Sequence, residues 1–215
     1  MAKYPELYEA ILHGDAKASE RIARQALNEN ADPMELVTES MIPAMDEVGR
    51  LFECEEYFVP ELLLSGRAMK AALGLIRPML AACGAEPAGR VVIGTVKGDL
   101  HDIGKNLVAS MLEGAGFEVV DLGADVSPEK FIEAVRAANA NIVCLSALLT
   151  VTMPAMKTTI EAMKSAGIRE KVKVMVGGAP VTLSYACEIG ADGYTENASG
   201  AVGLARRLSA GRQSP

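Results

Sequence analysis

Through residues 90–210, short apolar runs alternate with amphipathic segments, and no other feature of the sequence restricts the fold as strongly. The runs typical of β-strands occupy residues 90–95, 118–122, 141–146, 172–176 and 193–195. The segments with helical periodicity occupy residues 103–115, 128–138, 154–166, 182–189 and 198–210. Strands that alternate strictly with helices form parallel sheets, because each helix is long enough for a right-handed crossover. We therefore predict a doubly wound parallel sheet of five strands.

The region before this alternation shows helical periodicity and no strand pattern. Four helical segments joined by short loops predict a small four-helix bundle, and the third and fourth segments each carry one apolar face. Pro43 lies near the interior of the third segment, where it predicts a kink or a late helix start. Small and turn-forming residues at 81–90 indicate a linker. We predict an α/β protein with domains at residues 1–86 and 87–215, a helical bundle followed by a flavodoxin- or Rossmann-like doubly wound sheet.

Charge and composition argue against several classes of function. The net charge of -7 argues against a nucleic-acid surface, which would need a basic face, so we expect no nucleic-acid partner. We also expect no membrane partner and a cytoplasmic location, because the sequence has neither a signal-peptide pattern nor a long uncharged run. Four widely separated cysteines, Cys54, Cys83, Cys144 and Cys187, show no metal-binding spacing. We expect them to be free thiols that pack as small buried hydrophobes.

A histidine lies in the loop after the first predicted strand, in Gly98-Asp99-Leu100-His101-Asp102-Ile103-Gly104. Loops at the carboxyl ends of parallel strands bind ligands in open α/β sheets. The glycine spacing fits neither a dinucleotide fingerprint nor the phosphate loop of nucleotide triphosphatases. Metal ligation by His101 is a third interpretation, with Asp99 placed to orient its ring. A lone histidine cannot complete a structural zinc site, so a cofactor would supply the other ligands. A solvent-exposed or helix-capping histidine remains the alternative.

Three separated motifs resemble those of cobalamin-binding domains. The stretch Asp99-Leu100-His101-Asp102-Ile103-Gly104 matches the DxHxxG motif of that family. Ser146-Ala147-Leu148 resembles its SxL element, and Val176-Gly177-Gly178-Ala179 resembles its GG element. Residues 43–52 and 58–60 look like the helical cap of the cobalamin module of methionine synthase. From about residue 5 to 208, the chain is similar to stand-alone corrinoid proteins of methyltransferase systems.

The resemblance implies a set of cofactor-binding residues. His101 would be the lower axial ligand of cobalt, in place of the benzimidazole base, with Asp99 behind it. Thr152, where methionine synthase has a serine, would continue a relay from His101 through Asp99. Phe52 and Val59 would cover the upper, methyl-bearing face. The implied cofactor-binding residues are Gly98, Asp99, His101, Asp102, Ile103, Gly104, Ser146, Leu148, Thr152, Gly177, Gly178, Phe52 and Val59.

The resemblance also implies a methyl-group carrier that is not itself a catalyst. Its cofactor would be cobalamin or a related corrinoid, alternating between methylcob(III)alamin and cob(I)alamin. A donor-specific methyltransferase would methylate cobalt, and a second methyltransferase would pass the methyl group to a thiol, tetrahydrofolate or a pterin. A reductive activase would restore oxidised cobalt. A cobalamin-dependent sensor is the main alternative; a mutase subunit and a cofactor-free, flavodoxin-like binding module are the others.

Overall fold

The computed structural model describes residues 2–82 and 87–210. Contacts among Cα atoms divide these residues into two compact units. The first unit runs to Pro87 and includes Glu113–Gly116, and the second comprises Ala88–Leu112 and the chain from Phe117 onward. The centre of the predicted linker, residues 83–86, lies outside the described residues. The domain boundary between residues 86 and 87 therefore stays a prediction.

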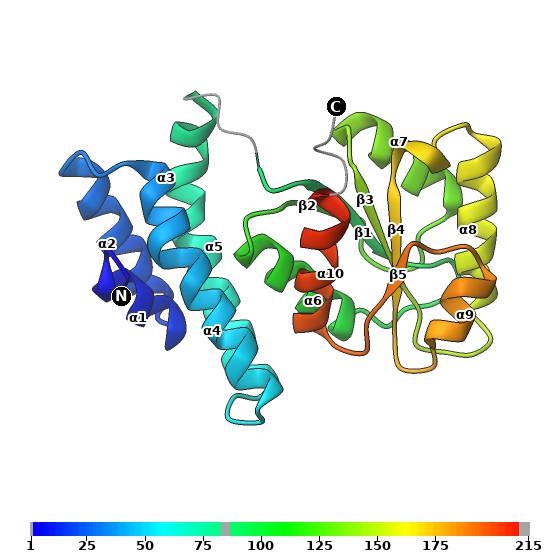
Figure 1. The fold of residues 1–215 in the computed structure, drawn as a ribbon, viewed down its shortest axis with the longest axis horizontal. Helices are drawn as coiled ribbons and strands as arrows, with labels where there is room; N and C mark the ends of the chain where they lie inside the picture. The colour runs from blue at the N-terminus through cyan, green and yellow to red at the C-terminus, as the bar shows by residue number, and fades with distance from the viewer. Residues whose placement is uncertain (1, 83–86, 211–215) are drawn as a thin grey trace. The chain divides into compact units, whose positions relative to one another are not determined.

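Helices build the first unit (Figure 1). They are α1 (Pro5–Leu12), α2 (Ala16–Asn28), α3 (Pro33–Leu36), the π-helical turn η1 (Val37–Met41), α4 (Ile42–Glu53) and α5 (Val59–Ala82). Because α3, η1 and α4 follow one another without interruption, residues 2–82 contain four helical segments, as the periodicity predicts. The apolar positions that share one face of α5 are buried, namely Leu62, Met69, Leu73 and Ile76. These side chains form part of the core of the bundle.

Pro43 lies directly after the π-helical turn, in the first turn of α4. The N–H of Ile42 donates to the carbonyl of Val37, five residues earlier, instead of following the four-residue spacing of an α-helix. A proline lacks the N–H group, and its ring clashes with the carbonyl four residues earlier, so a wider turn relieves the contact. The distortion predicted around Pro43 is therefore a π-turn within a continuous helix.

The second unit alternates strands and helices in the predicted order. Its elements are β1 (Arg90–Thr95), α6 (Ile103–Gly114), β2 (Glu118–Asp121), α7 (Pro128–Ala138), β3 (Ile142–Ser146), α8 (Pro154–Ser165), the 3₁₀ turn η2 (Arg169–Lys171), β4 (Lys173–Gly177), α9 (Leu183–Glu188), β5 (Gly193–Tyr194) and α10 (Ala198–Ala210). All neighbouring strands are parallel, in the order β2-β1-β3-β4-β5. This confirms the predicted doubly wound sheet of five strands.

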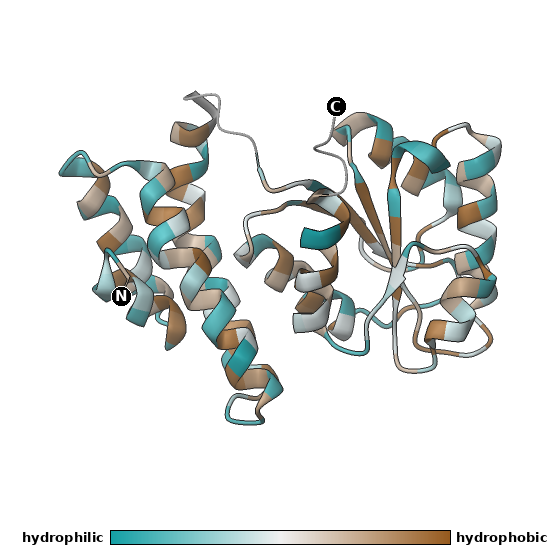
Figure 2. Ribbon diagram, in the orientation of Figure 1, coloured by the Kyte–Doolittle hydropathy of each residue, from teal (hydrophilic) through white to brown (hydrophobic). Residues whose placement is uncertain are grey.

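The sheet is covered on both faces (Figure 1). Helices α7, α8 and α9 pack against one face, and α6 and α10 lie on the other. The strand interiors are consequently apolar, as the brown colour of β1, β3 and β4 shows in Figure 2. The chain leaves β1 and β3 toward opposite faces of the sheet. In such sheets, ligands bind beyond the carboxyl ends of the strands at this switch point.

The cysteines differ from their predicted burial. Cys144, in β3, is buried, and its removal from water raises the pKa of its thiol to about 12. Cys54 and Cys187 are exposed, so the prediction that they are buried is wrong. Cys54 follows the last residue of α4, and Cys187 lies in the last turn of the short α9, where neither side chain faces the core. Cys83 lies outside the described residues.

Membrane-spanning character is absent from the helices in residues 2–82 and 87–210. None of these helices combines the length with the apolar character that a bilayer crossing requires.

Candidate functional site

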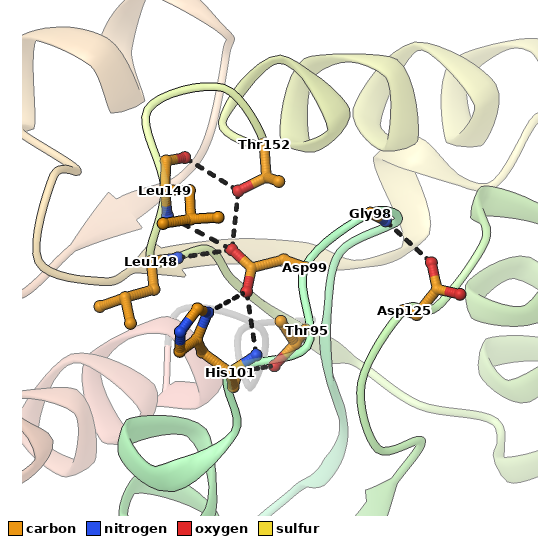
Figure 3. Close-up of polar contacts among 8 residues, drawn as sticks. All are labelled: Thr95, Gly98, Asp99, His101, Asp125, Leu148, Leu149 and Thr152. Carbon is orange, nitrogen blue, oxygen red and sulfur yellow. Dashed lines mark hydrogen bonds and ion pairs between the residues drawn. The ribbon is translucent and has the colours of Figure 1, made fainter.

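His101 lies in the loop from β1 to α6, at the carboxyl end of the sheet (Figure 3). Its side chain is half exposed, at 53%. Ring atom Nδ1 lies 3.1 Å from Oδ1 of Asp99, and the backbone N–H of His101 donates to the same oxygen at 3.0 Å. The hydroxyl of Thr95 donates to the carbonyl of His101 at 2.9 Å. Ring and backbone are thus held together, whereas no hydrogen bond joins Nε2 to a residue in the described parts of the chain.

Asp99 is fully buried and surrounded by donors (Figure 3). Its second carboxylate oxygen, Oδ2, accepts from the hydroxyl of Thr152 at 2.7 Å and from the N–H of Leu148 at 2.8 Å. A longer contact of 3.4 Å joins it to the N–H of Leu149. Burial by itself raises the pKa of Asp99, but the hydrogen bonds from Thr152, Leu148 and His101 outweigh it and hold that pKa well below its usual range. The carboxylate is therefore ionised at neutral pH.

The ionised state of Asp99 determines which nitrogen of His101 carries the proton. An ionised carboxylate only accepts hydrogen bonds, so Nδ1 of a neutral His101 must be the protonated nitrogen. The lone pair of the imidazole then lies on Nε2, the nitrogen without a described partner. This arrangement makes His101 available to a ligand or a metal through Nε2.

Thr152 offers Asp99 a hydroxyl with two possible partners. Besides Oδ2 of Asp99, the hydroxyl lies 2.8 Å from the carbonyl oxygen of Leu149. A hydroxyl has one proton, so it donates to the carboxylate while Asp99 is ionised and can turn to Leu149 if Asp99 takes up a proton. Tyr185 supports this loop from α9, because its hydroxyl donates to the carbonyl of Met153 at 2.7 Å. The chain thus has a continuous polar path from the His101 ring to Thr152.

The SxL and GG elements lie next to each other at the carboxyl edge of the sheet. Ser146, at the end of β3, is the register partner of Gly177, at the end of β4. The N–H of Ala147 donates to the carbonyl of Gly177 at 3.2 Å. A Cβ on Gly178 would lie 1.8 Å from the carbonyl oxygen of Ala147, and the φ of Gly178 is +133°. Only glycine fits here, and it lets the two strand ends run side by side.

Apolar side chains around His101 lie in solvent. Leu100 is 77% exposed and Ile103 is 75% exposed, on either side of the histidine in the sequence. Three further exposed apolar residues lie in the β3–α8 loop, namely Leu148, Leu149 and Val151. A Cβ on Gly104 would meet no atom within 4 Å. An imidazole with an unpaired nitrogen, exposed apolar side chains and open space at a glycine suits a large, mainly apolar group that carries a metal.

The remaining residues of the predicted set are placed as follows. Gly98 has a φ of +85°, and its N–H donates to Oδ1 of Asp125 at 2.8 Å. Asp102 accepts from the side chain of Asn106 at 3.1 Å. Phe52 and Val59 belong to the first unit, on either side of the turn between α4 and α5. His101 belongs to the second unit, and the place of Phe52 and Val59 over the cofactor stays a prediction.

Sequence reasoning missed Asp125, in the loop after β2. Besides accepting from Gly98, it donates its own N–H to the carbonyl of Asp99 at 2.9 Å. The N–H of Gly98 and the ammonium of Lys97 hold the pKa of Asp125 below its usual value. Its φ of +54° is unusual for a residue with a side chain, although aspartate tolerates it better than most. The only sequence signal is the Gly-Ala-Asp turn after the second predicted strand, which does not identify its partners.

Comparisons with known proteins match most of the length of the chain. Two family models of a B12 binding domain match residues 89–203 and residues 5–77. Dimethylamine corrinoid protein 1 of Methanosarcina acetivorans is 45% identical over 180 residues, which cover 83% of this chain and 84% of that protein. The trimethylamine corrinoid protein of Methanosarcina barkeri is 44% identical over 196 residues, or 90% of each chain. The crystal structure of the methanol:cobalamin methyltransferase complex MtaBC from Methanosarcina barkeri matches with a TM-score of 0.85 and 29% identity, covering 96% of this chain and 79% of that one.

Proposed function

The chain belongs to the family of B12-binding corrinoid proteins, and on that basis we propose that it is a methyl-group carrier. Such a carrier holds cobalamin or a related corrinoid, accepts a methyl group from one methyltransferase and gives it up to another. The names of its relatives support this role. The observation within the chain that carries it is His101, whose Nδ1 is held by a buried carboxylate while Nε2 has no described partner.

The residues around His101 suit a bound corrinoid. When bound, the corrinoid supplies a cobalt centre that accepts and releases a methyl group. His101 would hold this centre through Nε2, and Gly104 would leave room beside it. The other residues proposed to contact the cofactor in this unit are Gly98, Asp102, Ile103, Ser146, Leu148, Gly177 and Gly178.

Asp99 and Thr152 govern the proton of His101. The Asp99 carboxylate accepts a hydrogen bond from the Nδ1–H of His101, which leaves the lone pair on Nε2 for a metal. A proton at Nε2 would occupy that lone pair, and the ring could then not ligate a metal through this nitrogen. His101 thus binds or leaves a metal according to where the proton resides.

We further propose that Phe52 and Val59 shield the face of the cofactor remote from His101. Other apolar side chains are exposed nearby in the sequence, including Phe58 in the turn between α4 and α5, at 61%, and Leu64 in the second turn of α5, at 46%. An apolar cover of this kind excludes water from a reactive centre. Two partner enzymes need access to this face in turn, so the cover must move aside.

The partners we propose follow from the carrier role. A donor-specific methyltransferase delivers the methyl group, and a second methyltransferase passes it to a thiol, tetrahydrofolate or a pterin. A reductive activase returns oxidised protein to the cycle. The relatives named for dimethylamine and trimethylamine support methylated amines as the first donors to test.

Reconstitution with hydroxocobalamin tests the cofactor assignment. The wild-type protein should bind it stoichiometrically and show the absorbance of a corrinoid ligated by histidine instead of by its own base. His101→Ala should lose this spectrum. His13→Ala is the matched control, because His13 lies in the helical unit and is the only other histidine in the sequence. An unchanged spectrum in His101→Ala would contradict the assignment.

Label transfer tests the carrier role itself. Reduced, corrinoid-loaded protein should take up isotopic label from methyl-labelled dimethylamine or trimethylamine when a matching methyltransferase is present, and the His101→Ala variant should take up less. Failure of uptake from methylated amines and from methanol, with protein that binds the corrinoid normally, would contradict the carrier role but not the cofactor assignment.

A further inference from the structure

The loop from β1 to α6, residues 96–102, holds His101, and we call it the histidine loop. The loop from β2 to α7, residues 122–127, contacts the histidine loop through its backbone. We call these residues the brace loop. The carbonyl of Gly123 accepts from the N–H of Thr95 at 2.9 Å, and the N–H of Val126 donates to the carbonyl of Thr95 at 3.0 Å. Thr95 is the residue whose hydroxyl holds the carbonyl of His101. The brace loop is therefore connected to His101, the proposed ligand, through Thr95.

Asp125 adds three contacts from the brace loop. Its N–H donates to the carbonyl of Asp99, its Oδ1 accepts from the N–H of Gly98, and its Oδ2 accepts from the ammonium of Lys97 at 3.0 Å. Three consecutive residues of the segment that leads to His101 thus contact Asp125. Figure 3 shows the contact between Asp125 and Gly98 on a different side of the loop from the contact between Asp99 and Thr152.

A buried lysine connects the brace loop to the helix that follows His101. Lys105 lies in the first turn of α6, and its side chain is only 1% exposed. Its ammonium lies 2.6 Å and 2.5 Å from the two carboxylate oxygens of Asp121, and 2.6 Å from Oδ1 of Asn106. Asp121 is the last residue of β2, and its Oδ1 accepts from the N–H of Gly123 at 2.9 Å. The ion pair thus joins α6 to the first turn of the brace loop.

The chemistry of this pair points to positioning. A buried ammonium is costly unless it is paired, and well-packed apolar residues often replace a buried ion pair without loss of stability. Unlike apolar packing, hydrogen bonds to a carboxylate are directional, so Lys105 and the N–H of Gly123 must both approach the Asp121 carboxylate at defined angles. These two contacts therefore constrain the position of the first residues of the brace loop.

We propose that the Lys105–Asp121 ion pair and Asp125 are positioning residues for His101, which hold the histidine loop through the brace loop. Asp125 contacts the histidine loop on a different side from the contact between Asp99 and Thr152. Removing them leaves every described contact of the Asp99 carboxylate in place, but it frees the backbone on which Asp99 and His101 lie. The first arm of the test below uses cofactor-free protein, and only the second arm rests on the proposed function.

The first arm measures backbone hydrogen exchange by mass spectrometry. In Lys105→Met/Asp121→Leu, which removes both charges, peptides covering residues 97–106 should exchange about tenfold faster than in the wild type. Asp125→Ala should behave similarly, and it serves as the second variant should the double variant fail to fold. Asp125→Asn is its matched control, because an amide oxygen still accepts from Gly98 and asparagine tolerates the left-handed backbone. The control loses only the ion pair with Lys97, in which both side chains are exposed and which contributes little to stability.

Arg169→Met/Asp192→Leu is the control for general destabilisation. It removes another partly buried ion pair of the same unit, beside the amino end of β4, at 2.8 Å. This control should leave exchange at residues 97–106 unchanged. If neither Lys105→Met/Asp121→Leu nor Asp125→Ala speeds exchange there, the proposal is overturned.

The second arm uses protein loaded with hydroxocobalamin and lowers the pH. The wild type should lose the histidine-ligated spectrum at some midpoint pH, because a proton competes with the metal for Nε2. In Lys105→Met/Asp121→Leu and in Asp125→Ala, weaker positioning of His101 favours the proton over the metal at Nε2. The midpoint pH of these variants should therefore rise by about one pH unit if ligation is tenfold weaker. Asp125→Asn should match the wild type.

The two arms separate the possible failures. Faster exchange with an unmoved midpoint would show that the loop is braced but that the brace does not position His101, and it would overturn the proposal. Wild-type protein that binds hydroxocobalamin without a histidine-ligated spectrum would contradict the proposed function instead. In that case the exchange arm still decides whether the loop is braced.

Discussion

The hydroxyl of Thr152 lies 2.7 Å from Oδ2 of Asp99, although 53 positions separate the two residues in the sequence. The same carboxylate contacts His101 with its other oxygen. A buried carboxylate therefore links the loop after β1 to the loop after β3, the two loops at the switch point of the sheet. The position of the Asp99 carboxylate beside His101 therefore depends on both loops.

Thr152→Val tests the hydroxyl at constant shape. Hydrogen bonds to charged groups contribute about 1.5–3 kcal/mol, so the free energy of unfolding of the cofactor-free protein should fall by about 2 kcal/mol. Thr152→Ser keeps the hydroxyl and should lose less. Urea unfolding of both variants measures the difference. A smaller loss in Thr152→Val than in Thr152→Ser would mean that the methyl group, and not the hydroxyl, stabilises the site.

Asp99→Asn tests the charge of the buried carboxylate through pH. Because the pKa of Asp99 is lowered in the folded state, its ionisation contributes stability that is fully present above the unfolded pKa of about 3.9. As the pH falls below about 4, the unfolded chain takes up the proton first, and this contribution is progressively lost. The difference in unfolding free energy between wild type and Asp99→Asn should shrink as the pH falls from 5 to 3. A difference that grows over this interval would contradict the lowered pKa of Asp99.

Replacing Gly178 and Gly104 by alanine should change the stability of the protein to very different extents. Gly178→Ala places a Cβ 1.8 Å from the carbonyl oxygen of Ala147 at a φ of +133°, so the loss of stability should reach at least about 2 kcal/mol. Gly104→Ala meets no atom within 4 Å and should change the stability of the cofactor-free protein by less than about 0.5 kcal/mol. Thermal unfolding measures both effects.

The same glycine pair probes the proposed cofactor site. Gly104→Ala should weaken the binding of hydroxocobalamin in an equilibrium titration, because its methyl group would occupy space beside the proposed ligand. Unchanged affinity in this stable variant would show that the cofactor does not approach Gly104.

The thiols should differ in reactivity with iodoacetamide. Cys54 and Cys187 are exposed and should be alkylated in the native protein, whereas buried Cys144, with a pKa of about 12, should react only after unfolding. Mass spectrometry of peptides assigns each modification to its residue. Rapid native alkylation of Cys144 would contradict its burial in β3.

Local patterns determined the secondary structure and the type of sheet. The alternation of apolar runs with amphipathic segments predicted the bounds of β1 to β5 and of the helices that follow them to within about two residues. This is possible because the spacing of apolar residues along the chain follows directly from which face of a helix or strand is buried. The same locality explains why Asp99 could be named as the partner of His101. The two residues are two positions apart in one loop, so their contact needs little beyond that loop.

Family resemblance supplied what local pattern could not. Thr152, the SxL element and the GG element were singled out because they match motifs, and nothing in their own spacing indicates that Thr152 reaches Asp99. The obligatory glycine at position 178 is explained by the carbonyl of Ala147 on the neighbouring strand end. A contact between two strands depends on their register, which the sequence of either strand alone does not specify.

The sequence by itself thus determined the elements of the chain, the order in which they alternate and the position of His101 at the end of a strand. Only the tertiary structure decided that Asp125 holds the histidine loop, that Lys105 is buried against Asp121, and that Cys54 and Cys187 lie in solvent. The physical reason is distance along the chain. The periodicity of apolar residues indicates which face of a helix or strand is buried. The partner of a buried charge depends instead on how loops pack together, and these loops come into contact only in the folded protein.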